Sequence, residues 1–131
     1  YYSTAGFAIG GAGYYVSKSD CWNYNTSTDS WQQITGLPGD FTAQAGFSLN
    51  GYGYVLADAN RTSLDSDYPL QLWQYDSVQD HWLRLDYYPG KGTSTLRAAS
   101  VNGAVYIGFG YKMLNNLNDA DDLAGDFWKI Q

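Results

Sequence analysis

Residues 7–16 read FAIGGAGYYV, and the same pattern returns as FSLNGYGYVL at residues 47–56 and as ASVNGAVYIG at residues 99–108. Each copy has a central glycine, at positions 11, 51 and 103, and a tyrosine three residues later. The glycines are therefore spaced 40 and then 52 residues apart. A sequence that repeats at such a period indicates an array of similar structural units.

A second block follows the first two copies. Residues 21–31 read CWNYNTSTDSW, residues 72–82 read LWQYDSVQDHW, and a third copy begins as FWKI at 127–130. The motifs LPG at 37–39 and YPG at 88–90 then close the first two units. The recurring tryptophans are interpreted as packing residues between units, because they keep the repeat spacing.

Each unit is predicted to contain four short strands. In the first unit these are residues 5–9, 13–17 and 21–25 and a strand around Trp31, with Gly10-Gly11 as a tight turn. Aromatic residues make up 18% of the chain, which favours pleated surfaces, and we expect almost no helix because no helical periodicity is sustained. Four antiparallel strands per unit of about fifty residues are typical of a propeller blade.

This pattern resembles the kelch-repeat β-propellers, and more narrowly the galactose-oxidase-like kelch proteins of the Bacteroidota surface type. The residues that carry the resemblance are Gly13-Tyr14, Gly53-Tyr54, Asp20-Cys21-Trp22-Asn23-Tyr24, Trp73-Gln74-Tyr75-Asp76, Trp82 and Asp126-Phe127-Trp128. The resemblance implies an all-β, kelch-type propeller segment of four-stranded antiparallel blades in an incomplete ring. The blade units are expected at about 5–39, 45–90 and 98–131, with the fourth strand missing from the last.

The sequence departs from the kelch pattern after the second strand. Kelch blades usually carry a glycine pair there, whereas the first two units have Ser17-Lys18 and Ala57-Asp58, and only the third keeps glycines, at 108 and 110. Known propellers close with about 4–8 blades. Two hypotheses for closure stay open: further blades upstream or in another chain, and assembly of copies of this chain.

Composition excludes some partners. The net charge is −6 and the pI is near 4.3, which argues against nucleic acid or an anionic membrane as the partner. No apolar run approaches the ~20 residues that would span a bilayer, so membrane insertion is not expected. Cys21 has no second cysteine to pair with and is interpreted as a buried strand residue.

The long and variable insertions all follow the second strand of a unit, so they are expected at one edge of the scaffold, together with the connection after strand four. Loops on a rigid scaffold commonly carry binding sites. Tyrosines beside aspartates in these loops favour a glycan or a protein surface as ligand, whereas ordinary solvated loops are the alternative. The predicted ligand-binding residues are Asp58, Arg61, Asp65, Asp67, Tyr68, Tyr87, Tyr88 and Tyr111.

A calcium site is a further hypothesis. Asp119, Asp121 and Asp122 provide hard oxygen ligands, although the spacing and glycine of an EF-hand loop are missing. No other cofactor is expected.

The expected function is a non-catalytic binding or scaffolding module in the C-terminal part of a larger cell-surface or secreted protein. The alternative is a sialidase- or oxidase-like carbohydrate-active propeller whose active site is completed by other blades. The single histidine, His81, does not supply the two that a galactose-oxidase copper site needs, and the turns lack the full Asp-box of sialidases. The expected partners are the remaining blades or another protein chain, with a glycan as a second candidate, and the location is extracytoplasmic.

Overall fold

The chain is built from strands throughout the part that the computed structural model describes, which is residues 4–17, 20–39, 41–59, 70–88, 96–108 and 127–130. No helix occurs in these ranges. The strands are β1 (Ala5–Ile9), β2 (Ala12–Ser17), β3 (Asp20–Asn25), β4 (Ser30–Ile34), β5 (Phe41–Leu49), β6 (Tyr52–Ala59), β7 (Gln71–Asp76), β8 (His81–Tyr87), β9 (Arg97–Val101), β10 (Ala104–Gly108) and β11 (Phe127–Ile130). The first unit thus has its four strands where the sequence predicts them, with β2 and β3 each beginning one residue earlier.

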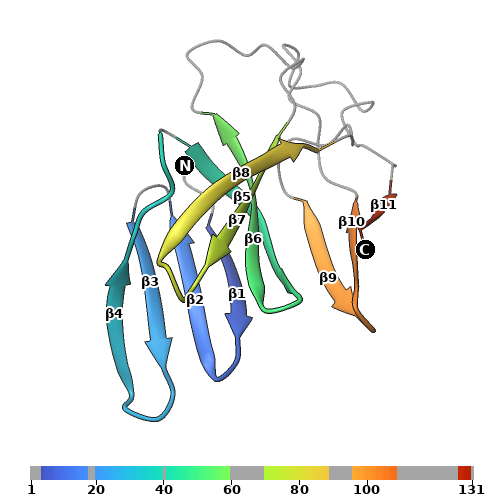
Figure 1. The fold of residues 1–131 in the computed structure, drawn as a ribbon. Helices are drawn as coiled ribbons and strands as arrows, with labels where there is room; N and C mark the ends of the chain where they lie inside the picture. Colours follow the sequence, from blue (N-terminus) through green and yellow to red (C-terminus); the bar gives the residue numbers. More distant parts are fainter. Residues whose placement is uncertain are drawn as a thin grey trace, which may run out of the picture.

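The strands form three separate antiparallel sheets (Figure 1). Sheet 1 has the order β1-β2-β3-β4 and sheet 2 the order β5-β6-β7-β8, so each strand pairs with the next one along the chain. Sheet 3 contains β9, β10 and β11 in that order among the described residues. Repeated up-and-down sheets standing face to face are the blade arrangement of a propeller.

The first hairpin of each sheet turns over two residues. Asn50 and Gly51 have φ of 53° and 84°, and Asn102 and Gly103 have 51° and 78°. Two consecutive residues of positive φ define the turn whose twist matches that of the flanking strands, and asparagine and glycine tolerate this conformation best. In sheet 1 the same place is occupied by Gly10, with φ of 60°.

The hairpins β3–β4 and β7–β8 share a different turn. Asn25 Oδ1 accepts hydrogen bonds from the backbone N–H groups of Ser27 and Thr28 at 2.9 and 3.3 Å. Asp76 does the same for residues 78 and 79, at 2.9 and 3.2 Å. These bonds fix the first half of a four-residue turn that ends in an aspartate, Asp29 or Asp80, with φ of 51°.

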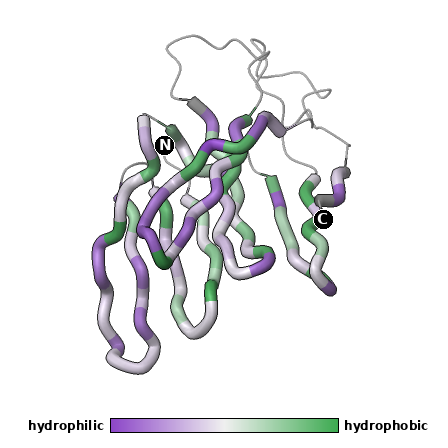
Figure 2. The backbone as a smooth tube through the Cα atoms, in the orientation of Figure 1, coloured by the Kyte–Doolittle hydropathy of each residue, from purple (hydrophilic) through white to green (hydrophobic). Residues whose placement is uncertain are grey.

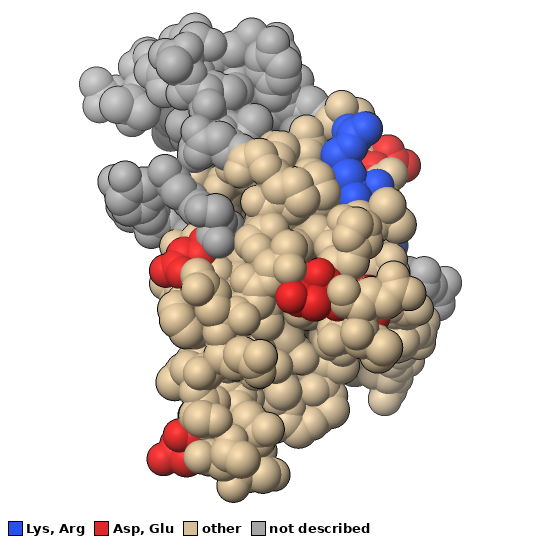
Figure 3. Space-filling model, turned by 60° about the vertical axis from the view of Figure 1, so that its left-hand side comes forward, with Lys and Arg blue, Asp and Glu red and all other residues tan. Residues whose placement is uncertain are grey.

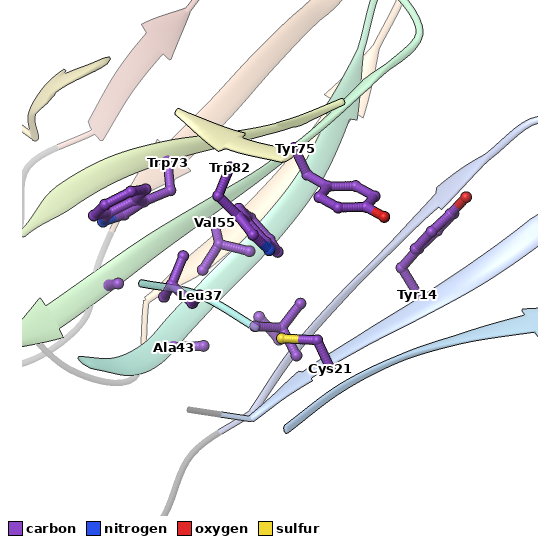
Figure 4. Packing of buried hydrophobic residues seen from close by; sticks show 11 residues of the cluster. Tyr14, Cys21, Leu37, Ala43, Val55, Trp73, Tyr75 and Trp82 are labelled. Atoms are coloured by element: carbon purple, nitrogen blue, oxygen red, sulfur yellow. The ribbon is translucent and has the colours of Figure 1, made fainter. Parts of the chain in front are cut away.

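Apolar side chains fill the two spaces between the sheets. The larger cluster joins sheets 1 and 2 and contains Ala5, Tyr14, Val16, Cys21, Leu37, Ala43, Val55, Ala57, Trp73, Tyr75 and Trp82 (Figure 4). The second cluster joins sheets 2 and 3 and contains Ala45, Phe47, Leu56, Leu70, Tyr88, Leu96, Val105 and Ile107. Sheet 2 therefore has two apolar faces, and Figure 2 shows hydrophobic and hydrophilic stretches interleaved along the strands.

An aromatic stack is repeated at the centre of sheets 1 and 2. Phe7 stacks on Tyr14 with ring centroids 5.1 Å apart and planes 13° from parallel, and Phe47 stacks on Tyr54 at 5.1 Å and 12°. The tyrosine is the repeat residue that follows the central glycine by three positions. Packing thus explains this tyrosine in sheets 1 and 2, since aromatic pairs across strands stabilise a sheet.

Candidate functional site

One edge of the scaffold collects the ends of strands β2, β6, β8 and β10, which all run toward the top of Figure 1. Two predicted binding residues are described there. Asp58 lies on β6 opposite Thr42 and is half-buried, and Tyr87 ends β8 opposite Gln71. The other predicted ligands in the insertions lie outside the described residues, namely Arg61, Asp65, Asp67, Tyr68 and Tyr111 together with the calcium candidates Asp119, Asp121 and Asp122.

Tyr87 presents an aromatic ring at this edge. Its side chain is 51% exposed, and its hydroxyl accepts a hydrogen bond from Arg84 Nη1 at 3.2 Å. The Arg84 guanidinium also lies 5.4 Å from the centre of the Tyr87 ring, so a cation–π contact holds the same pair. Asp86, whose Oδ1 accepts from the Tyr87 backbone N–H at 2.7 Å, places an exposed carboxylate beside them. Ring, guanidinium and carboxylate together offer a ligand a stacking surface, hydrogen-bond donors and hydrogen-bond acceptors.

The structure contradicts the prediction that Tyr88 faces a ligand at this edge. Tyr88 is 3% exposed and belongs to the core between sheets 2 and 3, and its backbone N–H donates to the Leu70 carbonyl at 2.7 Å. The reason is its position in the repeat, where it corresponds to Leu37, which is 2% exposed in the core between sheets 1 and 2. The segment leaving each blade therefore inserts one large side chain between that blade and the next.

A polar junction joins sheets 1 and 2 beside this core, and sequence reasoning did not find it. Asp80 accepts hydrogen bonds from the Thr35 backbone N–H at 3.0 Å and from the Thr35 hydroxyl at 2.8 Å. The Trp82 indole N–H donates to the Thr35 carbonyl at 2.8 Å, and the Tyr75 hydroxyl donates to Asp80 at 2.7 Å. We call these four residues the Thr35 junction. The signal in the sequence was the recurrence of tyrosine and aspartate five residues apart, at 24 and 29 and at 75 and 80.

The electrostatics of the junction follow from these bonds. Partial burial by itself raises the pKa of Asp80, but the bonds from Tyr75 and Thr35 outweigh it and hold the pKa below its usual value of 3.8. Burial and the same bond to Asp80 raise the pKa of Tyr75 far above its usual value. The junction is therefore built for an ionised aspartate and a neutral tyrosine.

The side of sheet 1 that faces away from sheet 2 is a second candidate surface. Tyr15, Trp22 and Trp31 line a hollow of about 400 Å³ there, and its lining is almost entirely apolar. Tyr15 pairs with Trp22 across β2 and β3, and Tyr24 pairs with Trp31 across β3 and β4. We call these four residues the outer aromatic face. On the face of the molecule drawn in Figure 3, acidic groups lie at separate places and most basic groups lie together near the upper edge.

A second hollow lies where the first hairpins of the three sheets meet. It has a volume of about 330 Å³, and Ala8, Gly10, Ser48, Asn50, Ser100 and Asn102 are among its lining residues. The Ser100 hydroxyl donates to the Ser48 carbonyl at 3.0 Å, which ties sheet 3 to sheet 2 at this place. Polar and apolar groups contribute equally to its lining, which also includes Ile9, Leu49 and Val101.

Trp22 and Trp73 occupy equivalent positions but have different polar partners. The Trp22 indole N–H donates to Asp20 at 2.8 Å. In sheet 2 the residue equivalent to Asp20 is Gln71, and neither the buried Gln71 Oε1 nor the buried Trp73 Nε1 has a hydrogen-bond partner among the described residues. The two blades therefore differ at the entry to their third strands.

The residues considered for catalysis are not brought together. Cys21 is fully buried, and burial, despite opposing backbone hydrogen bonds, raises the pKa of its thiol. His81 is an exposed residue at the start of β8. Within the described ranges, no group of three His, Cys, Asp or Glu side chains is arranged to hold a metal ion. None of the described segments forms a helix long and apolar enough to cross a membrane.

The sheets and their order make this chain a β-propeller-type segment of antiparallel blades. Comparison with solved structures supports that fold: the structure of YjhT is similar with a TM-score of 0.67 and 17% sequence identity, over 86% of this chain. The matched region spans 35% of the YjhT chain. No family model matches the sequence, and no curated protein matches it either.

Proposed function

We propose that this chain is part of a kelch-type propeller and acts as a non-catalytic binding and scaffolding module, which engages a glycan or a protein partner through the edge that contains Tyr87. Several recurring positions support the kelch assignment. Gly51 and Gly103 have positive φ in equivalent hairpin turns. Tyr14, Trp73 and Trp82 pack in the core between sheets 1 and 2. The remaining propeller blades are proposed as further partners of the segment.

The arrangement at Tyr87 carries this proposal. The Tyr87 ring is 51% exposed at the end of β8, Arg84 holds it from one side, and Asp86 adjoins it. A ring held in one orientation loses little conformational entropy when a ligand stacks on it. The adjoining carboxylate can accept hydroxyl protons of a sugar or amide protons of a protein.

Two observations favour binding over catalysis within the described residues. The Cys21 thiol is buried, and its raised pKa keeps it protonated, so it is a poor nucleophile. Asp80, the carboxylate of the Thr35 junction, is used to join two blades. The resemblance to surface-type kelch proteins supports an extracytoplasmic location, which we include in the proposal.

A glycan array with the full chain tests the glycan ligand, with Tyr87→Ala as the variant and Tyr52→Ala as its matched control. Tyr52 is also an exposed strand tyrosine, but it lies at the opposite edge, beside the β5–β6 turn. We expect Tyr87→Ala to weaken glycan binding by about tenfold, the loss of one aromatic contact, while Tyr52→Ala leaves it unchanged. Equal binding by all three proteins would place the glycan site elsewhere.

The protein ligand is tested with the same two variants. Tyr87 is first replaced by a photo-crosslinking amino acid to capture a partner protein. The affinity of that partner for the wild type, for Tyr87→Ala and for Tyr52→Ala is then measured. Dependence on Tyr87 alone supports the proposal. If no glycan binds and no partner depends on Tyr87, this edge is not a binding surface.

A further inference from the structure

Sheets 1 and 2 carry corresponding residues on corresponding faces. Among the described residues, only the face on sheet 2 is covered by another sheet. In sheet 2 the four positions are Val55, Trp73, Tyr75 and Trp82, and all are at most 8% exposed. Their equivalents in sheet 1 form the outer aromatic face. The register is the same in both sheets, since Val55 pairs with Trp73 as Tyr15 pairs with Trp22, and Tyr75 pairs with Trp82 as Tyr24 pairs with Trp31.

The four sheet 2 positions are covered by the face of sheet 1 that points toward sheet 2, which is the face opposite to the outer aromatic face. The Phe7 ring lies 6.3 Å from Tyr75 and 6.5 Å from Trp82, and the Tyr14 ring lies 5.6 Å from Tyr75. Leu37 completes the apolar cover, and Thr35 closes the polar side of it by bonding to Asp80 and Trp82. One complete interface of this kind is therefore visible within the chain (Figure 4).

Sheet 1 presents the same polar groups without that cover. The Tyr24 hydroxyl donates to Asp29 at 2.5 Å, as the Tyr75 hydroxyl donates to Asp80, and both aspartates have φ of 51°. Yet Trp31 is 60% exposed, whereas Trp82 is 3% exposed. Among the described residues, no group takes the place beside Asp29 and Trp31 that Thr35 takes beside Asp80 and Trp82.

We propose, building on the proposed role of the chain as a propeller segment, that the outer aromatic face is a docking surface for a further complete antiparallel blade. The segment that follows the fourth strand of that blade, its exit segment, places a threonine or serine between Asp29 and Trp31. The backbone N–H and hydroxyl of that residue donate to Asp29, and its carbonyl accepts from the Trp31 indole N–H. The hollow lined by Tyr15, Trp22 and Trp31 receives apolar side chains of the incoming blade. This interface would continue, on the other side of sheet 1, the one that sheets 1 and 2 already form.

A second copy of the described strands is not the occupant we infer. The blade face that would have to dock is that of sheet 3, and it lacks two features of the visible interface. The equivalents of the stacked Phe7 and Tyr14 are Ala99 and Tyr106, so the aromatic stack is missing. No exit segment follows a fourth strand in the described part of sheet 3, so no counterpart of Thr35 is described there.

The experiment supplies a further blade from the chain's own sequence. A second copy of residues 5–44 is inserted between Thr4 and Ala5, which preserves the native spacing because Ala45 corresponds to Ala5. Two readouts are measured for each copy of Trp31: hydrogen exchange of the indole N–H and quenching of tryptophan fluorescence. Replacing Trp31 by phenylalanine in one copy at a time assigns each signal to its copy. We expect the original Trp31 to exchange at least about tenfold more slowly than in the unextended chain, while Trp31 of the inserted copy stays exposed.

Two variants make the result decisive. Asp29→Ala in the original copy should abolish most of the added protection, whereas Asp29→Ala in the inserted copy should not. The insertion is repeated with Tyr15→Val, so that the four positions of the original sheet match sheet 2 in full. If the inserted copy remains unfolded in both backgrounds, or folds while the original Trp31 stays exposed, the proposal is wrong.

Two alternative occupants are measured on the unextended chain. Protection of Trp31 that rises with protein concentration, together with a dimer mass in light scattering, would show that a second copy covers the face and would overturn the proposal. Glycan binding that is lost in Trp31→Ala would show a sugar platform and would overturn it as well. Trp31 exchange that is independent of concentration and of glycans is the result we expect.

Discussion

Trp82 and Trp31 occupy the same place in two blades, so their truncation isolates the contribution of the interface between sheets 1 and 2. We expect Trp82→Ala to destabilise the chain much more than Trp31→Ala. Trp82 is 3% exposed and donates a hydrogen bond to Thr35, whereas Trp31 is 60% exposed and has no such bond among the described residues. The comparison cancels effects of residue type and of strand propensity.

The magnitude can be worked from the burial. A tryptophan side chain buries ~200 Å² in a core, and the two exposed fractions differ by a little over half, so Trp82 loses about 100 Å² more buried area. At ~25 cal/mol per Å² this amounts to about 2.5 kcal/mol. The lost hydrogen bond adds about 1 kcal/mol. The free energy of unfolding should therefore fall by about 3–4 kcal/mol more in Trp82→Ala than in Trp31→Ala.

Urea unfolding followed by circular dichroism measures both free energies. Because a small domain has only ~5–15 kcal/mol of stability, Trp82→Phe serves as a milder variant that keeps an aromatic ring and removes the indole N–H. Its expected loss is about 1–2 kcal/mol. Equal losses for Trp82→Ala and Trp31→Ala would refute the reasoning, because they would mean that the interface described here does not stabilise the chain in solution.

Two further predictions concern the same interface. Because the folded pKa of Asp80 lies below its unfolded value, its ionised form contributes stability that is present above about pH 4 and lost as the pH falls through the folded pKa. Asp80→Asn should lower stability by about 1 kcal/mol at pH 7 and flatten the loss below pH 4, measured by urea unfolding from pH 7 to pH 3, and an unchanged acid profile would contradict the assignment. A methyl group at Gly53 would stand 2.1 Å from the Phe7 ring, whereas at the equivalent Gly13 no atom lies within 4 Å. Gly53→Ala should therefore cost about 1–3 kcal/mol and Gly13→Ala less than about 0.5 kcal/mol in the same assay, and similar values for both would show that the ring moves aside freely.

The strands of this protein were predictable because their signals are local. The alternation of Trp22 and Tyr24, the tight turn at Gly10 and the spacing of the copies place the first three strands to within one residue. A period-2 pattern and turn residues depend only on neighbours in the chain. The number of blades that close a ring is not a local property, and the repeat pattern does not contain it.

Burial was predicted less well than strand position. The sequence treats Trp31 and Trp82 alike, but one is exposed and the other is buried, because burial depends on whether a neighbouring sheet is present. Tyr88 was assigned to a binding edge although the repeat aligns it with Leu37, and this alignment would have predicted the core position. The bonds between Asp80 and Thr35 join residues 45 positions apart, and no local pattern indicates such a contact.

Because of the Thr35 junction, the stretch of chain that holds together does not coincide with one sheet: it begins at Thr35, before sheet 2, and runs to the end of sheet 2. The residue that Asp80 and Trp82 bind belongs to the segment that precedes sheet 2, so a graft of residues 41–87 would import the binding groups and leave their target behind. Chimeras cut ahead of Thr35 keep both halves of the contact. Recombination between such repeats should accordingly tolerate crossovers ahead of the exit segment better than crossovers in the short linker that follows it.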